Sequence, residues 1–338
     1  MFKTILVPLD GSARAEYALP MAAQLARHTG GMVVLVRVAS IATDYWPTIT
    51  SPVPSMMQSA VDGEMKEAAT YLKNVASAAE LAGIEITTTA RYGVAAPVIL
   101  STVIDYHADL IVMCSHGFTG VAHVIMGSVA EKISRHASVP VLVVREKGGF
   151  PGINPAEISL PLRILVPLDG SSHAMAALEP AAALLTAIAA PAQKTALHLV
   201  RVVGPVEKRN EMQGVQRDVL TARRYLSQTM ELIREGSIAP SFSKQHIPIS
   251  WSVALDTNIA EAIIRVAENG EDVEGAGVFG GCDLIALATH GWGWIQHWTM
   301  GSVAERVLHA TKRPILLIRP LIALNKQRHV LETEGIPG

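Results

Sequence analysis

Cysteine is scarce in this chain. Its 338 residues include two cysteines, Cys114 and Cys282, which are too few for a disulfide framework. The two thiols stand at opposite ends of corresponding apolar segments, so the sequence favours neither a disulfide nor a shared metal site. Free cysteines are most often buried as small apolar side chains, and we expect that here.

An excess of either charge is also lacking. The chain has 28 Lys and Arg against 30 Asp and Glu, a formal net charge of −2. Binding of DNA or RNA normally needs a basic face, so we expect neither as a partner. No apolar run reaches the ~20 residues that span a bilayer, and the opening does not resemble a signal peptide. We therefore expect no membrane partner and a cytoplasmic location.

Aromatic and charged residues are few as well, at 5% and 17% of the chain. Hydrophobic residues make up 49%, mostly alanine, valine, leucine and isoleucine, as in a well-packed soluble protein. A chain of 338 residues has room for two domains, each with its own core.

What the sequence does contain is an internal repeat. Residues 114–131 follow a short apolar run, and residues 288–305 repeat their Gly, Ser and Glu positions at an offset of 174 (302 − 128). The opening segment 5–12 returns as 164–171 at an offset of 159. The second repeat therefore gains 15 residues (174 − 159), and we expect ten of them in a Gly- and acid-rich insert at about 269–281.

Strands and helices alternate within each repeat, which predicts an α/β protein with a parallel sheet and helices on both faces. In the first repeat, we expect strands at 4–9, 32–38, 84–92, 110–113 and 139–144, and helices at 13–28, 64–82, 95–106 and up to His136. The segment from about Ser40 to Val61 is predicted as a long loop, a lid or a partner surface. Predicted boundaries are domain 1 at 1–146, a Gly- and Pro-rich linker at 147–161, domain 2 at 162–320 and a tail at 321–338.

The paired Val-Pro-Leu-Asp-Gly-Ser openings and His-Gly…Gly-Ser loops resemble the universal stress protein family, here as a tandem of two domains. The resemblance implies two Rossmann-like (adenine nucleotide alpha hydrolase-like) domains. Each would be a five-stranded parallel sheet of order 3-2-1-4-5 with helices on both faces. It further implies that strands 139–144 and 314–318 pair antiparallel, which makes one chain its own pseudo-dimer. The sequence leaves open whether two chains also form a homodimer.

Many members of this family bind ATP through Gly-x₂-Gly-x₉-Gly-Ser/Thr. The chain keeps this spacing twice but replaces the first glycine, by Cys114 and by Ala288. The resemblance implies that the aspartates and valines contact adenosine and that the glycines and serines hold the phosphates. The first site implied is Pro8, Leu9, Asp10, Val38, Cys114, His116, Gly117, Gly127, Ser128 and Val129. The second is Pro167, Leu168, Asp169, Val202, His290, Gly291, Gly301, Ser302 and Val303. The ligand would be ATP, ADP or AMP, with Mg²⁺ beside the phosphates of ATP.

Structural interpretations of the same residues need no ligand. Ser128 with Glu131, and Ser302 with Glu305, fit the Ser-x-x-Glu capping box that closes a helix N-terminus. The two aspartates can satisfy backbone N–H groups in Asp-Gly turns. Neither His116 nor His290 has a carboxylate or nucleophile at a spacing that would make it a general base, so a structural or phosphate-adjacent role is favoured.

The second site differs from the first. Trp292, Trp294 and Trp298 fall between its last two glycines, where we expect a packing or partner role. By alignment of the repeats, Ala254 stands where the first has Gly93. Both differences predict that the second site is the less complete one.

Neither glycine loop contains a lysine, so this is not a Walker-type P-loop, and an efficient ATPase is disfavoured. We predict an adenine-nucleotide-binding stress-response or regulatory module and not an enzyme, beyond weak ATP hydrolysis at most. One alternative is a slow ATPase on the same fold. Another is a nucleotide-free module that works through its surfaces. The sequence does not name a regulatory protein partner.

Overall fold

The protein consists of two halves with the same order of strands and helices. The computed structural model describes residues 1–40, 54–115, 126–145, 161–189, 193–204, 212–273, 277–290 and 300–320. The predicted tail and all but the last residue of the predicted linker lie outside these ranges.

The first half ends at the fifth strand. Its elements are β1 (Thr4–Leu9), α1 (Ala13–Glu16), α2 (Leu19–Thr29), β2 (Met32–Ala39), α3 (Pro54–Ala76), the short 3₁₀ helix η2 (Ala79–Leu81), β3 (Glu85–Tyr92), α4 (Ala95–Asp105), β4 (Leu110–Cys114), α5 (Ser128–His136) and β5 (Val141–Val144).

The second half repeats this order and adds a small hairpin. Its elements are β6 (Leu162–Pro167), α6 (Ser172–Met175), α7 (Leu178–Ile188), β7 (Thr195–Val203), α8 (Met212–Arg234), α9 (Pro240–Gln245), β8 (Ile249–Leu255), α10 (Ile259–Asn269), β9 (Glu271–Val273), β10 (Gly277–Phe279), β11 (Leu284–Ala288), α11 (Ser302–Ala310) and β12 (Ile315–Ile318).

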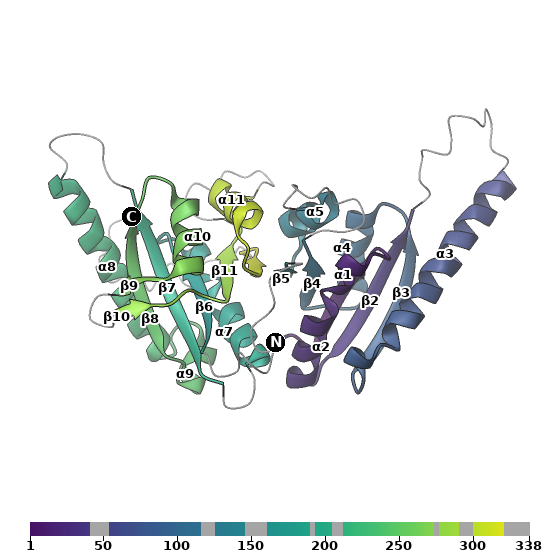
Figure 1. The fold of residues 1–338 in the computed structure, drawn as a ribbon, viewed down its shortest axis with the longest axis horizontal. Helices are drawn as coiled ribbons and strands as arrows, with labels where there is room; N and C mark the ends of the chain where they lie inside the picture. Colours follow the sequence, from purple (N-terminus) through teal and green to yellow (C-terminus); the bar gives the residue numbers. More distant parts are fainter. Residues whose placement is uncertain are drawn as a thin grey trace.

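A single ten-stranded sheet runs through both halves, in the order β3-β2-β1-β4-β5-β12-β11-β6-β7-β8. The described neighbours within each half pair in parallel, whereas β5 and β12 pair antiparallel where the halves meet. Figure 1 shows the first half on the right and the second on the left, with α3 and α8 at the two outer ends. The predicted α/β fold and the antiparallel pairing of the last strands are therefore present.

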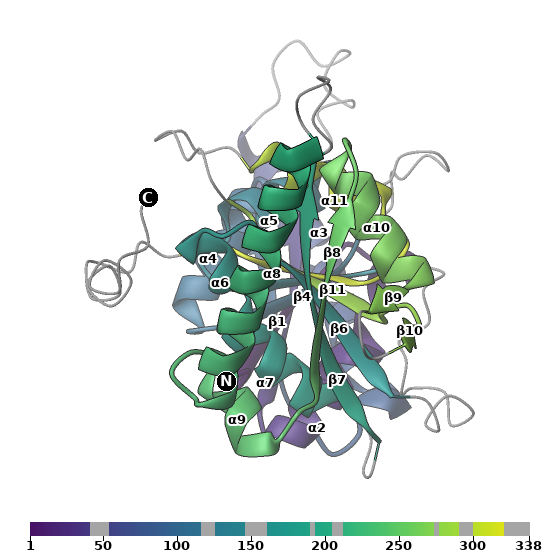
Figure 2. The same cartoon turned by 90° about the vertical axis from the view of Figure 1, so that its left-hand side faces the viewer.

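The strands are apolar runs because both faces of the sheet are covered. Side chains alternate along a strand, so Ile5 and Val7 belong to one buried cluster and Leu6 to the other. The first cluster includes residues of α2, α3 and α7, and the second includes residues of α4, α5, α10 and α11. Figure 2 shows α8 and α10 on opposite sides of the second half's strands.

Two predicted helices have different bounds in the structure. The predicted loop 40–61 is wrong from residue 54 on, because α3 begins at Pro54. Proline fits a first helical turn, where its missing N–H has no partner to lose. The predicted helix 13–28 is divided into α1 and α2, with Pro20 in the first turn of α2.

The extra residues of the second half form a hairpin. The last residue of α10 comes 164 positions after the last residue of its counterpart α4 (269 − 105). The first residue of β11 comes 174 positions after the first residue of its counterpart β4 (284 − 110). The second half therefore gains ten residues between α10 and β11. Here β9 and β10 pair antiparallel, with Val273 opposite Gly277. The hairpin lies on the domain 2 side, away from the junction of the halves (Figure 1).

Reciprocal arginine contacts also connect the halves. Buried Arg145, just after β5, donates to the carbonyl of Leu308 in α11, and Arg319, just after β12, donates to the carbonyl of His136 in α5 at 3.4 Å. The two arginines are repeat equivalents (319 − 145 = 174). A cation at a helix C-terminus is favoured by the helix dipole. Burial lowers the pKa of Arg145 to about 10.

Candidate functional site

The carboxyl ends of β1 and β4 lie side by side, because the two strands are neighbours in the sheet. From β1 the chain continues into α2 on one face of the sheet, and from β4 into α5 on the other. Such a reversal is where open α/β sheets bind ligands. Asp10 directly follows β1, and Cys114 is the last residue of β4.

Asp10 and the two residues after it form a tight turn. Asp10 Oδ1 accepts hydrogen bonds from Ser12 N at 3.0 Å and from Ser12 Oγ at 2.7 Å. Ser12 Oγ in turn accepts from Ala15 N at 3.2 Å and caps α1. Gly11 has a φ of 91°, which glycine adopts without strain. One oxygen of Asp10 therefore has the structural role expected for an Asp-Gly turn.

The second half repeats this turn closely. Asp169 Oδ1 accepts from Ser171 N at 2.8 Å and from Ser171 Oγ at 2.6 Å, and Ser171 Oγ accepts from Ala174 N at 3.1 Å. Gly170 has a φ of 94°. The local geometry at the end of the first strand is thus kept in both halves.

The start of α5 contradicts the predicted capping box. Gly127, not Ser128, is the N-cap residue, and no side chain makes a cap hydrogen bond there. The reason is a contact outside the helix: Gly127 N donates to Ser115 O at 2.8 Å, which fixes Gly127 at the end of β4. Ser128 is consequently the first helical residue, with an exposed side chain. Unpaired N–H groups at a helix start attract anions.

The capping box is also wrong at α11. Gly301 is the N-cap residue and donates to Thr289 O at 2.8 Å, so Ser302 begins the helix without capping it. The φ of Gly301, −62°, suits any residue. A Cβ at Gly301 would lie 3.3 Å from Thr289 O, so glycine permits the close approach of the two backbone segments.

Several predicted site residues lie outside the described residues. These are His116, Gly117, Gly291, Trp292, Trp294 and Trp298. The other predicted residues are described: Pro8, Leu9 and Val38 are in β1 and β2, Val129 is the second residue of α5, and their counterparts Pro167, Leu168, Val202 and Val303 lie in or beside β6, β7 and α11. His290 Nδ1 is 2.9 Å from Thr289 Oγ1.

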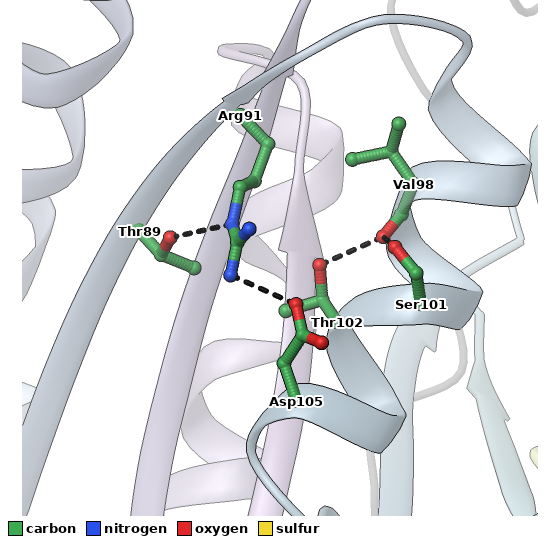
Figure 3. A network of polar contacts seen from close by, with 6 residues as sticks. All are labelled: Thr89, Arg91, Val98, Ser101, Thr102 and Asp105. Carbon is green, nitrogen blue, oxygen red and sulfur yellow. Dashed lines mark hydrogen bonds and ion pairs between the residues drawn. The ribbon is translucent and has the colours of Figure 1, made fainter.

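An arginine network beside Val38 was not apparent from the sequence. Arg91 of β3 lies next to Val38 in the sheet. Its guanidinium donates to Thr89 Oγ1 at 3.1 Å and to Asp105 Oδ2 of α4 at 3.0 Å, which ties the edge strand to the helix (Figure 3). Thr102 reinforces α4 by donating to Val98 O at 2.7 Å.

The register corrects the assignment of Ala254. Val202 pairs with Ala254 as Val38 pairs with Arg91, so Ala254 corresponds to Arg91 and not to Gly93. The counterpart of Gly93 is Asp256, because both donate at 3.1 Å to the last residue of the second strand of their half, Gly93 to Ala39 O and Asp256 to Val203 O. The second half therefore replaces a glycine by an aspartate at this edge.

A second network of polar and aromatic side chains packs against the turn at Asp10. The Arg37 guanidinium is 3.2 Å from Glu67 Oε1 and 4.9 Å from the centre of the Tyr71 ring. A Cβ on Gly11 would lie 3.2 Å from Arg37 Cζ, so the guanidinium packs against the turn. Tyr71 OH donates to Glu16 Oε1 at 2.8 Å. Burial, and then this hydrogen bond to a carboxylate, raise the pKa of Tyr71.

The second half keeps the aromatic contact and loses the acids. Arg201 lies 5.1 Å from the centre of the Tyr225 ring, and burial raises the pKa of Tyr225 to about 12. Met175 replaces Glu16 (175 − 16 = 159), and Thr221 replaces Glu67 (221 − 67 = 225 − 71 = 154). The second turn is thus backed by two fewer negative charges.

Comparison with known proteins agrees with this duplicated architecture. The family model described as "Universal stress protein family" matches residues 1–145 and again residues 162–319. The chain belongs to the universal stress protein family. Among the described residues of this universal stress protein, no helix is both long and apolar enough to cross a membrane.

Some of the relatives match nearly the whole of this universal stress protein, and others match one half of it. Universal stress protein Rv2005c of Mycobacterium tuberculosis is 23% identical over 93% of this chain and 96% of its own. Universal stress protein YxiE of Bacillus subtilis is 30% identical over 43% of this chain and all of its own. A universal stress protein structure from Archaeoglobus fulgidus covers 94% of this chain and 99% of its own, with a TM-score of 0.56 and 17% identity. That likeness concerns the fold.

Proposed function

We propose that this protein binds an adenine nucleotide (ATP, ADP or AMP) at the carboxyl edge of its first half and acts as a stress-response or regulatory module. The observation that carries the proposal is the start of α5, where Gly127 is the N-cap and no side chain caps the helix. The first N–H groups of a helix have no partner within the helix, so a phosphate at this helix start would accept hydrogen bonds from them.

The proposed roles follow the family resemblance. Gly117, Gly127 and Ser128 would hold the phosphates, and Asp10 and Val38 would contact the adenosine part. Cys114 stands where the family pattern has its first glycine, and it is buried at the end of β4. Mg²⁺, when ATP is bound, would sit beside the phosphates and offset their charge.

A second, weaker site in the other half is part of the proposal. It would use Asp169, Val202, Gly291, Gly301 and Ser302. The turn at Asp169 and the uncapped start of α11 match those of the first half, which supports binding. The replacement of Gly93 by Asp256, and the three tryptophans between Gly291 and Gly301 in the sequence, support a weaker affinity.

Binding without efficient turnover is proposed because residues 114–131 and 288–305 contain no lysine. Phosphoryl transfer would need such a cation to offset charge on the transferred group. Slow hydrolysis is compatible with the same site. We place the protein in the cytoplasm, where its two free, buried cysteines would stay reduced.

The direct test is the release and identification of bound nucleotide. The full chain is purified without added nucleotide and denatured, and the released small molecules are separated against ATP, ADP and AMP. Recovery of ATP supports the proposal, and recovery of ADP or AMP supports it together with slow hydrolysis. An empty protein that also fails to take up ATP in calorimetry contradicts it and favours a nucleotide-free interaction module.

Two matched variants then separate the sites. Gly127→Val is expected to abolish binding in the first half while the fold is kept, because the backbone angles of Gly127 (φ −74°, ψ 151°) suit valine. Gly301→Val is expected to remove only the weaker binding event. Unchanged ATP affinity and stoichiometry in Gly127→Val would show that the first site is assigned wrongly.

A further inference from the structure

A cluster of four ionisable side chains lies where α5 and α11 meet at the junction of the halves. It contains Glu131 and Arg135 from α5, and Glu305 and His309 from α11. Glu305 is the repeat equivalent of Glu131, and His309 is the equivalent of Arg135 (305 − 131 = 309 − 135 = 174). The junction thus repeats its glutamate but not its arginine.

One arginine serves both carboxylates. Arg135 Nη2 lies 2.8 Å from Glu131 Oε1 and 2.7 Å from Glu305 Oε1, across the junction. A guanidinium presents several N–H donors in a plane and can hold two carboxylates at once. The two carboxylates and the one guanidinium leave a formal charge of −1, which a further cation would offset, and the equivalent position on α11 does not hold a second arginine.

That position holds His309, one helical turn after Glu305 on the same face of α11. The ligand atoms of Glu131, Glu305 and His309 all lie within 4.8 Å of one another. Among the described residues, His309 forms no hydrogen bond or ion pair. The carboxylate side chains are 35% and 39% exposed, so an ion from solvent can reach them.

We propose that Glu131, Glu305 and His309 bind a divalent transition metal ion, of which Zn²⁺ is the representative, and that the ion bridges the two halves. One imidazole and two carboxylates are ligands that zinc accepts, and water would complete four-coordination. Arg135 contacts Oε1 of each glutamate, so the metal would take Oε2 of each. The positive charge of Arg135 repels the ion, so this site is expected to bind zinc with a lower affinity than a closed structural zinc site does.

A metal held in this way would act on the stability of the whole molecule. Its ligands come from both halves, so the ion binds only when the halves are docked. Such a ligand stabilises the folded state by an amount that rises with the logarithm of its concentration once that concentration exceeds its dissociation constant. The inference is independent of nucleotide binding, because none of the three proposed metal ligands is among the residues proposed to hold the nucleotide.

The test uses the full chain, freed of metal with a chelator, and titrated with ZnCl₂ alone. We expect saturable binding of one zinc per chain and a rise in unfolding temperature. Co²⁺ substituted at the site is expected to give visible absorption bands of a low-symmetry, nitrogen- and oxygen-ligated ion. A wild-type chain that takes up no zinc, or takes it up without a change in unfolding temperature, overturns the proposal.

The variants exchange the residues at the one pair of equivalent positions, 135 and 309, where the two halves differ in this cluster. His309→Arg places the repeat's own arginine on α11 and is expected to eliminate the zinc-dependent stabilisation, and His309→Gln is the second variant should the first not fold. Arg135→His creates a Glu-x₃-His pair on each helix and is expected to tighten zinc binding by at least about tenfold. His136→Gln, at the exposed end of α5, is the matched control and is expected to bind like the wild type. Equal zinc binding by the wild type and both His309 variants would contradict the assignment.

Discussion

Leu142 of β5 lies directly opposite Leu316 of β12, and the two are repeat equivalents of each other (316 − 142 = 174). On either side of this pair the equivalents exchange places, with Val141 opposite Leu317 and Val143 opposite Ile315. An approximate two-fold axis therefore passes between the two leucines. The junction has the self-complementary form of a contact between identical subunits, although it lies within one chain.

Truncation of either leucine is expected to destabilise the whole molecule. Both side chains are fully buried, so Leu142→Ala and Leu316→Ala should each lower the free energy of unfolding by about 2–5 kcal/mol. Because the two residues share a contact, the double variant should depart from the sum of the single effects. Denaturant unfolding of the four proteins measures this. Losses below about 1 kcal/mol would show that the junction is not part of the stable core.

The first half expressed alone, as residues 1–146, is expected to dimerise. Removal of the second half leaves the β5 edge unpaired, and exposed edges pair with other chains. The near-symmetric register lets a second copy of β5 occupy the place of β12. Sedimentation over a range of concentrations measures the association. A stable monomer at every concentration would contradict this expectation.

His198 of β7 is expected to make stability depend on pH. It is fully buried, with Nδ1 2.9 Å from Ser250 Oγ and Nε2 2.9 Å from Ser252 Oγ, both on β8. Burial, with a smaller effect of Arg163, lowers its pKa from 6.5 to about 4. The unfolded chain thus binds a proton between these values that the folded protein excludes. Stability should fall by about 3 kcal/mol as the pH drops from 6.5 to 4.

The matched control is His198→Val, since valine stands at the equivalent position, Val34, of the first half (198 − 34 = 164). This variant should lose that part of the pH dependence, whatever its stability at neutral pH. Unfolding free energies at several pH values between 4 and 7 provide the comparison. Parallel pH profiles for the two proteins would mean that His198 does not carry the effect.

Two serines at helix starts are expected to behave differently. Ser12 caps α1, so Ser12→Ala should cost about 1 kcal/mol of stability. Ser128 caps nothing, so Ser128→Ala should leave stability nearly unchanged and weaken nucleotide binding if its hydroxyl contacts a phosphate. Thermal unfolding and calorimetric titration of both variants give the answer. A loss of stability in Ser128→Ala as large as in Ser12→Ala would restore the capping interpretation.

Asp10 combines a turn with a charge, and two substitutions separate them. Asp10→Asn keeps an oxygen that can accept from Ser12 N and Ser12 Oγ, so stability should change little. Asp10→Ala removes that acceptor and should destabilise the turn by about 1 kcal/mol. If the charge contacts the adenosine part, both variants should lose affinity for ATP. If Asp10→Asn kept full affinity for ATP, the charge of Asp10 would not contribute to nucleotide binding, and its role would be limited to the hydrogen bonds of the turn.

Much of the fold was predictable because buried parallel strands consist of continuous runs of apolar residues. Leu110–Cys114 and its counterpart Leu284–Ala288 follow this rule, and the offset between repeats located the extra ten residues. Contacts between distant segments were not predictable. The bond from Gly127 to Ser115 O moves the helix start by one residue, and only the docking of the halves brings His309 to Glu131. The arginine networks at Arg37 and Arg91 depend in the same way on tertiary neighbours.

Joining two copies of the fold in one continuous sheet has a consequence for inheritance. A homodimer carries two identical sites, and any mutation alters both. Here the two turns can differ: Glu16 and Glu67 stand behind the first turn, and Met175 and Thr221 hold the equivalent positions behind the second. Every molecule then contains one of each version, in a fixed ratio that neither gene dosage nor exchange of subunits can disturb.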